Sequence, residues 1–286
     1  MELALGITVN SLVLAAMYIL VALGFALLFS IAGILNFAHG AIYMVGGYVC
    51  YQFAVEYGLN VWVAVLISMI IVGAFGLFLE RFCFRPFSGD MFRTIVIAIA
   101  VIIILETAIN ASVGSVGIRA IPMLASGRLG MGPVSVTWER VVTVVTTGVL
   151  LAVMMWFIER TKQGLQMRAI AEDSEGATLQ GVRIHRISAL TCGIGCALAA
   201  VAGCFMGSMF NLSPFMGDLM LVKATEIVII GGIGSIGGVL AGGLVLGVID
   251  AALPQVLSGA ATQAVGLGVI IVFLLFRPQG FFGRLV

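Results

Sequence analysis

The sequence predicts an all-α, polytopic membrane protein. Of its 286 residues, 62% are hydrophobic and only 9% are charged, whereas a soluble domain carries about 25% charged residues. The apolar residues form continuous runs, not the alternating pattern of an outer-membrane barrel. Because a helical span needs roughly 20 apolar residues, the chain has room for about eight or nine spans with short loops. This composition excludes a soluble enzyme, a nucleic-acid-binding protein and a disordered regulator.

The apolar runs predict the positions of the spans. They lie near residues 8–32, 40–55, 61–80, 93–113, 140–158, 188–210, 223–236, 238–257 and 261–276. The second and seventh runs are short and bounded by glycine, which is typical of broken or re-entrant segments. The chain starts without the basic residues of a secretory signal, so we expect the first run to be a retained span. A single transmembrane domain over residues 1–286 is therefore expected.

Basic residues predict the orientation, because cytoplasmic loops carry an excess of lysine and arginine. Three groups are present: Arg81, Arg85 and Arg93; Arg160, Lys162, Arg168, Arg183 and Arg186; and Arg277 with Arg284. Placing all three groups in the cytoplasm gives nine crossings and an external N-terminus. Arg119, Arg128 and Arg140 then lie outside, within a glycine- and proline-rich stretch that we expect to be an external loop over about 114–139.

Small residues recur every four positions in several runs. One helix face carries Gly195, Ala199, Gly203 and Gly207, and the pairs Gly238/Gly242 and Gly243/Gly247 repeat the spacing. Small residues let helices approach closely in lipid, so we expect tight packing within the chain. A seam against a second, similar subunit is the alternative. The five cysteines lie mostly in apolar runs and are interpreted as small buried hydrophobes, with no metal site expected.

Two glycine-bounded breaks are candidates for a translocation path. The first is Gly33–Gly40, which contains Asn36 and His39, and the second is Gly231–Gly238. The second matches the dinucleotide fingerprint as a string, but neither a soluble strand nor a suitably placed acid accompanies it. Unwound backbone at membrane depth is tolerated where it is buried in protein or lines a watery cavity. Paired breaks in two halves of a transporter commonly mark the solute route. The candidate path residues are Asn36, His39, Gly40, Gly232, Gly234 and Gly237; simple kinks are the alternative.

Ionisable residues inside the runs are few. They are Glu106, Lys223, Glu226 and Asp250. Lys223 and Glu226 are three residues apart on a helix, which predicts that they neutralise each other. Neither lysine of the chain lies in a phosphate-binding loop, and the two histidines are too far apart to suggest a catalytic set. No cofactor is expected, and active transport would have to draw energy from a partner or an ion gradient.

The most charged part of the chain is the segment 159–187, which we expect to be a cytoplasmic loop with short amphipathic helices. Gly181 is expected to end one of them, because glycine adopts the left-handed conformation at a helix end without penalty. Within this segment, Glu175-Gly-Ala177 followed by Gly181 resembles the "EAA" loop of ABC importer permeases, the element that docks on the ATPase. Gly176 replaces the middle alanine of that motif, and the downstream Ile-x-Leu-Pro is missing.

Three blocks extend this resemblance over nearly the whole chain. They are Leu35–Tyr48 with its Asn-Phe-Ala-His-Gly string, Arg168-Ala-Ile-Ala-Glu-Asp173 with Ala177 and Gly181, and Gly231–Gly238. Together they are similar to the signature blocks of LivH-type permeases, the inner-membrane subunits of branched-chain amino acid ABC importers in bacteria. The closing Arg277-Pro-Gln-Gly280 is also similar to the end of that family.

The resemblance implies partners and site residues. The partners would be cytoplasmic ATPase subunits, a second permease subunit that is homologous or identical, a periplasmic solute-binding protein, a small amino acid and the lipid bilayer, with no nucleic acid. The coupling residues would be Arg168, Glu172, Asp173, Glu175, Ala177 and Gly181. Related permeases carry urea, amides and other small solutes, so the solute stays open.

The leading hypothesis is therefore a permease subunit without its own ATP site, which moves branched-chain or similar small amino acids across the inner membrane. An ion-coupled secondary transporter acting alone is the main rival, and a passive facilitator or channel is another. A membrane enzyme is disfavoured, since the sequence yields no nucleophile–base or metal set.

Overall fold

The computed structural model describes residues 2–33, 36–113, 119–131, 134–232, 234–257, 259–277 and 279–282. Their elements are α1 (Glu2–Ala32), α2 (His39–Tyr51), η1 (Gln52–Glu56), α3 (Val61–Leu79), η2 (Glu80–Phe84), η3 (Arg85–Phe87), α4 (Met91–Val113), β1 (Arg128–Met131), β2 (Val134–Thr137), α5 (Trp138–Arg160), α6 (Lys162–Glu172), α7 (Ser174–Leu179), α8 (Ile184–Met209), α9 (Met216–Gly231), α10 (Ile236–Ala252), η4 (Leu253–Gln255) and α11 (Gly259–Phe276). The all-α fold class predicted from composition is confirmed, with one short antiparallel hairpin, β1–β2, added in the described residues.

The predicted apolar runs correspond to helices, except the seventh, which extends beyond the end of α9. Among the described residues, six helical segments are long and apolar enough to cross a membrane: Leu5–Ala32, Val61–Phe87, Met91–Val113, Trp138–Arg160, Ile184–Met209 and Ile236–Gln255. The helices α2, α9 and α11 are shorter, and α2 and α9 correspond to the two runs expected to be broken. The seventh run was misplaced: α9 covers Met216–Gly231, not 223–236, because Gly232 has a φ of 95° and ends the helix.

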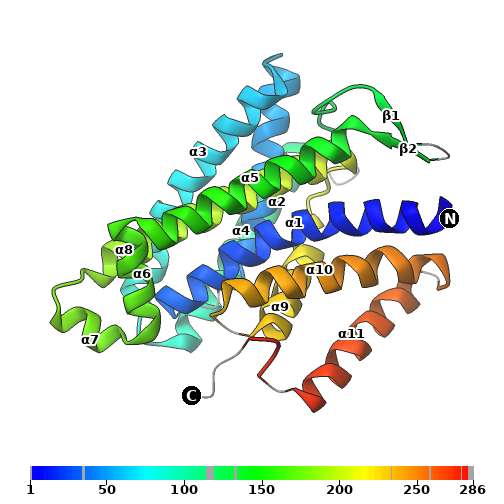
Figure 1. Cartoon of the computed structure of the whole chain (residues 1–286). Coiled ribbons are helices and arrows are strands. Elements are labelled where there is room, and N and C mark those ends of the chain that lie inside the picture. The colour runs from blue at the N-terminus through cyan, green and yellow to red at the C-terminus, as the bar shows by residue number, and fades with distance from the viewer. Residues whose placement is uncertain are drawn as a thin grey trace.

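The bundle has two distinct ends (Figure 1). One end carries the short helices α6 and α7, and we call it the α6–α7 end; there Arg85 bonds to the carbonyl of His185 at the start of α8. The other carries the hairpin and the start of α1, and we call it the hairpin end; there Arg140 donates to Asn10, and Arg119 pairs with Leu212. The basic groups assigned to opposite sides of the membrane therefore lie at opposite ends. Residues 114–118, 132–133 and 284 of these predictions lie outside the described residues.

Helices from the two halves of the chain exchange partners in the core. The helix α1 packs along α10, and α3 packs along α8, so helices of the first half of the chain pack directly on helices of the second half. The helices α2 and α9 pack against each other; α2 also packs along α8 and meets α1, while α9 packs on α1 and α10. The core therefore centres on α1, α2, α8 and α9, while α3, α4, α5 and α11 leave large apolar faces exposed. Such faces are expected of helices that meet lipid or a neighbouring subunit.

The small-residue stripes pack within the chain, as expected. A Cβ added to Gly195 would lie 2.9 Å from the carbonyl oxygen of Gly24, and one on Gly247 would meet α1 at Ala15. Gly231 and Gly238 likewise oppose each other across the turn between α9 and α10. The stripes are therefore used for close helix contact inside this subunit. The five cysteines are free thiols, and Cys192, Cys196 and Cys204 are fully buried, as interpreted from the sequence.

Candidate coupling segment and interrupted helices

The helix α6 is fixed to the bundle by its cap and by one apolar face. The hydroxyl of Thr161 accepts a hydrogen bond from the backbone N–H of Gly164 at 3.0 Å, which satisfies one of the free donors at the helix start. Met167 and Ile170 are 1% and 4% exposed and belong to the main hydrophobic core. Their spacing of three residues places both on the inner face. The α6 helix is therefore a packed part of the bundle and not a free loop.

The helix α7 begins at a cap that the sequence analysis did not identify. The carboxylate of Asp173 accepts hydrogen bonds from the N–H groups of Glu175 and Gly176, each at 3.0 Å. A Cβ on Gly176 would lie 2.5 Å from Asp173 Oδ2, so the capping carboxylate occupies the space that a larger residue would need. This contact gives a local reason for the glycine that replaces the alanine of the "EAA" motif. Asp173 thus has a structural function in addition to its charge.

The turn after α7 confirms the expected helix end. Gly181 has a φ of 84°, and its N–H donates to the carbonyl of Thr178 at 2.9 Å. The N–H of Val182 then returns to the carbonyl of Ala177 at 3.0 Å. Ala177 itself is 4% exposed and packs against the main core, so α7 is held by one small contact on its inner side. The left-handed φ at residue 181 favours glycine strongly.

The outer side of α6 and α7 combines apolar and charged side chains. Leu179 is 89% exposed and Leu165 is 60% exposed, although both stand in a highly polar segment. The predicted coupling residues Arg168, Glu172, Asp173 and Glu175 are exposed on the same two helices. Single exposed leucines are ordinary on a protein surface, but this pair stands next to acids and bases at the end of a membrane bundle. The arrangement suits contact with another protein better than contact with water.

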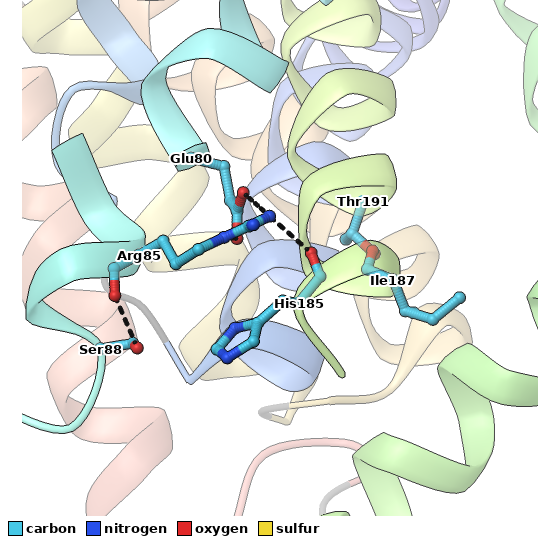
Figure 2. A network of polar contacts seen from close by, with 6 residues as sticks. All are labelled: Glu80, Arg85, Ser88, His185, Ile187 and Thr191. Atoms are coloured by element: carbon cyan, nitrogen blue, oxygen red, sulfur yellow. Dashed lines mark hydrogen bonds and ion pairs between the residues drawn. The ribbon is translucent and has the colours of Figure 1, made fainter. Parts of the chain in front are cut away.

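An arginine clamp connects the α3–α4 turn to the segment that follows α7. Arg85 donates to Glu80 through Nε at 3.2 Å and through Nη2 at 2.8 Å, and the same Nη2 donates to the carbonyl of His185 at 3.0 Å. Figure 2 shows the Arg85 side chain between Glu80 and the start of α8. The Glu80 side chain is only 3% exposed, so this two-bonded ion pair also neutralises a buried carboxylate. From the sequence, Arg85 was expected only to indicate the orientation of the chain in the membrane.

A small cavity joins α6 to the second glycine-rich break. Its volume is about 60 Å³, and its lining includes Ser30 of α1, Met167 and Arg168 of α6, and Gly234. One of the predicted coupling residues and one of the predicted path residues therefore share a cavity. This proximity was not foreseen, because the two segments are far apart in the sequence.

The second break, which the sequence predicted as unwound backbone at membrane depth, lies at the α6–α7 end of the bundle. Gly234 is exposed, whereas Gly232 is buried, and both have positive φ angles, 87° and 95°. The backbone N–H groups of Phe281 and Phe282 donate to the carbonyls of Ile230 and Gly231, so the C-terminal segment covers this turn. Gly237 has open space around its Cβ position. Ile233, within the break, lies outside the described residues.

The first break leads into the interior of the bundle. Asn36 and His39 are fully buried, and His39 Nε2 lies 3.1 Å from the carbonyl oxygen of Val21, well before α1 ends at Ala32. The ring of His39 also lies beside that of Phe25, with centroids 6.1 Å apart. Residues 34 and 35 lie outside the described residues. The helix α2 therefore starts beside an inner position of α1, which agrees with the broken or re-entrant segment that its short apolar run predicted.

The first turns of α2 and α9 meet at this inner position. A Cβ on Gly40 would overlap the carbonyl oxygen of Gly217, and a Cβ on Gly217 would overlap that of Gly40. The break that corresponds to residues 33–38 is therefore 210–215, before α9, and not Gly231–Gly238 as predicted from the glycine pattern. Asn211, Ser213 and Pro214 were the signal for it, because such residues cluster in loops between helices.

A second buried polar cluster lies between α1, α9 and α10. Lys223 Nζ is 3.1 Å from Asp250 and 3.3 Å from Glu226, and Tyr18 donates a hydrogen bond of 2.8 Å to Asp250. The predicted Lys223–Glu226 pair is confirmed. Lys223 has a second and slightly closer partner, Asp250 of α10, which the spacing of residues within α9 could not predict. The three charged side chains are 10–12% exposed.

These features define a class of protein before any comparison is made. Membrane-length helices, two helices that start inside the bundle and a packed segment of charged helices at one end are typical of a polytopic transport permease. Within the described residues, no cluster of three or more potential metal ligands is present.

Comparisons with known proteins agree with this class. The family model of the branched-chain amino acid transport system permease component matches residues 7–275. The high-affinity branched-chain amino acid permease protein BraD of Pseudomonas aeruginosa is 35% identical over 96% of this chain and 94% of its own length. The corresponding LivH protein of Escherichia coli K12 is 32% identical over 96% and 94%. The chain therefore belongs to the family of branched-chain amino acid transport permease components.

A further similarity is more limited in extent. The fructose import permease protein FrcC of Rhizobium meliloti is 37% identical over 115 residues, which cover 37% of this chain and 31% of FrcC. No solved structure matches the chain.

Proposed function

We propose that this chain is the permease subunit of an ABC importer for branched-chain or similar small amino acids. In this proposal α6–α7 is the cytoplasmic element that docks on the ATPase subunits, and the hairpin end faces the periplasm of a bacterial cell and receives the solute-binding protein. A second permease subunit, identical or homologous, completes the pair in the inner membrane. The relatives that support the solute are permease proteins of high-affinity branched-chain amino acid transport systems.

The observation that supports the docking function best is the two-sided character of α6 and α7. Their inner side is fixed by Met167, Ile170 and Ala177, while Leu165 and Leu179 are exposed on the outer side. A push on such an element is transmitted to the bundle, because packed interiors have low compressibility. The cavity that Arg168 and Gly234 share then connects the docking surface to a break between two membrane helices.

The test is a change on the outer side that leaves the inner side intact. Leu179→Asp should abolish copurification of the ATPase and ATP-driven leucine uptake while membrane insertion stays normal, since Leu179 is 89% exposed. The matched control is Val256→Asp at the hairpin end, where the side chain is 84% exposed. Normal ATPase copurification by Leu179→Asp, or equal loss of ATPase copurification in both variants, would show that α6–α7 is not the docking element.

A second candidate function keeps the importer but changes the solute. The 115-residue similarity to a fructose import permease favours this possibility, because a shared permease scaffold does not by itself determine what is carried. Uptake by the complete importer in proteoliposomes, measured with labelled leucine and labelled fructose, distinguishes the two. Transport of fructose but not leucine would replace the leading proposal.

A further inference from the structure

His39 and Tyr43, four residues apart, share one face of α2, and Asn36 lies in the turn just before it; we call these three side chains the α2 face. Asn36, His39 and Tyr43 are spaced by three and four residues, and each is fully buried. Both amide atoms of Asn36, the Nδ1 atom of His39 and the hydroxyl of Tyr43 have no hydrogen-bond partner among the described residues. Four unpartnered polar atoms on one short segment are unusual, because nearly all buried polar groups in proteins are paired.

The hydrogen bond of His39 determines what its other nitrogen can do. The partner of Nε2 is the carbonyl oxygen of Val21, so Nε2 must carry the proton and donate it. In the neutral ring Nδ1 is then an acceptor. Asn36 adds one acceptor and two donor hydrogens, and Tyr43 adds a hydroxyl that serves in either way. Both kinds of hydrogen-bonding group are therefore present, with no charged side chain among the three residues.

The same place carries the positive end of a helix. The start of α2 has no side-chain cap and no acidic residue in its first turn, and it meets the equally uncapped start of α9. In α9 the first turn contains Asp218, which offsets the partial positive charge there. The start of α2 has no such residue. Half-helix N-termini at an inner position of a transporter are suited to hold an anionic group of the solute.

We propose that the start of α2 is a head-group site for the transported amino acid. The carboxylate of the solute binds at the N-terminal turn of α2 with the amide nitrogen of Asn36, and its ammonium group donates to His39 Nδ1 and the Tyr43 hydroxyl. This inference rests on the proposed function and names the subsite within it. A zwitterion fits because it has no net charge, like the three side chains. Since the atoms are enclosed, the solute reaches them when the Gly40–Gly217 contact opens.

The experiment compares stability with transport in isosteric variants of the complete importer in proteoliposomes. Asn36→Leu and Tyr43→Phe each remove unpartnered polar atoms and keep the shape. If the atoms serve the solute, both variants should unfold at the same temperature as the wild type or higher, because an unpaired buried group has been removed. Initial uptake of labelled L-leucine at low concentration should fall about tenfold in each, which corresponds to one lost hydrogen bond to a charged group.

The matched control is Tyr48→Phe, which removes another buried, unpartnered hydroxyl further along α2. It should transport like the wild type. Normal leucine uptake by Asn36→Leu and Tyr43→Phe would overturn the head-group site, and so would a parallel loss of stability and uptake, which would assign these atoms to the fold. If Asn36→Leu fails to insert, Tyr43→Phe decides. A wild-type importer that takes up no leucine with ATP would instead refute the proposed function, and the head-group site with it.

Discussion

The bundle contains two buried polar clusters that differ in how far the chain itself completes them. Around Lys223, the ammonium group contacts Asp250 and Glu226, and Tyr18 donates to Asp250. Along the start of α2, Asn36, His39 and Tyr43 keep unpartnered atoms although they are fully buried. The first cluster joins α9 and α10 through an ion pair and α1 through the hydrogen bond of Tyr18. The second has donors and acceptors without hydrogen-bond partners among the described residues, and we propose that the solute satisfies them.

The difference separates the two usual reasons for polar groups inside a membrane protein. Charged residues at depth are expensive and either pair with one another or serve the solute route. Lys223 and its partners fit the first case, because two carboxylates, those of Asp250 and Glu226, lie within ion-pair distance of the lysine. One Glu226 oxygen has no hydrogen bond, but it is the atom that lies 3.3 Å from Lys223 Nζ, so the ion pair accounts for it. The α2 face fits the second case.

The largest expected effect comes from removing the cation of the completed cluster. Lys223→Met leaves Asp250 and Glu226 buried without a counter-charge, and breaking a buried pair in this way costs about 3–5 kcal/mol. We expect loss of most folded protein, measured as the midpoint of unfolding in a denaturant titration of the purified subunit. Lys162→Met, at the exposed start of α6, is the control with the same change. Equal stability of the two variants would contradict the structural interpretation of the Lys223 cluster.

The next effect tests whether the starts of α2 and α9 meet. Gly40→Ala places a Cβ onto the backbone of Gly217, and overpacking of this kind costs about 1–3 kcal/mol. Gly148→Ala in α5 is the matched control, because a Cβ there has nothing within 4 Å. Thermal unfolding should show a lower midpoint for Gly40→Ala and an unchanged or higher one for Gly148→Ala. The reverse order would place the two helix starts apart.

A smaller effect is expected from single hydroxyl groups. Tyr18→Phe removes a hydrogen bond of 2.8 Å to a carboxylate and should lower the free energy of unfolding by about 1.5 kcal/mol. Tyr48→Phe removes a buried hydroxyl that has no partner and should not lower it. A double-mutant cycle of Tyr18→Phe with Asp250→Asn measures the coupling directly. If the two changes are additive, Tyr18 does not belong to the cluster.

The smallest effect concerns a buried, unpartnered hydroxyl far from α2. Thr147 of α5 is 2% exposed, and its Oγ1 has no partner among the described residues. Thr147→Val keeps the shape, so stability should stay within about 0.5 kcal/mol of the wild type or rise slightly. Leucine uptake by the complete importer should be unchanged. Reduced uptake would mean that unpartnered atoms outside the α2 face also matter for transport, and the α2 site would lose its specificity.

The sequence predicted most of the fold because apolar run length and glycine position are local properties. The two short runs were correctly expected to be interrupted helices, and Gly181 was correctly expected to end α7, since each depends on residues next to it in the chain. The start of α9 was placed seven residues late. Its first turn contains Met216, Gly217 and Asp218. From the sequence alone, an acidic residue beside an apolar run is taken as part of the preceding loop, unless the helix that packs against it is known.

The candidate sites were predicted less completely than the helices. Arg168, Glu172, Asp173 and Glu175 were expected on one exposed segment, and they lie on one. The capping by Asp173, the clamp of Arg85 on His185 and the cavity that joins Arg168 to Gly234 were not expected. Each of the last two depends on contacts between residues that are tens of positions apart, for which a single sequence holds no signal.

The sequence by itself determined that this chain crosses a membrane as helices, where most of those helices lie, and which permease family it resembles. These properties follow from hydropathy, small-residue spacing and short motifs, all of which are written along the chain. Only the tertiary structure decided that Gly40 meets Gly217 and that Asp250 completes the Lys223 pair. It also decided that the Asn36 amide and the Nδ1 atom of His39 have no hydrogen-bond partner among the described residues inside the bundle. The physical reason is that a buried polar group is satisfied or left open by its neighbours in space, and packing chooses those neighbours from distant parts of the chain.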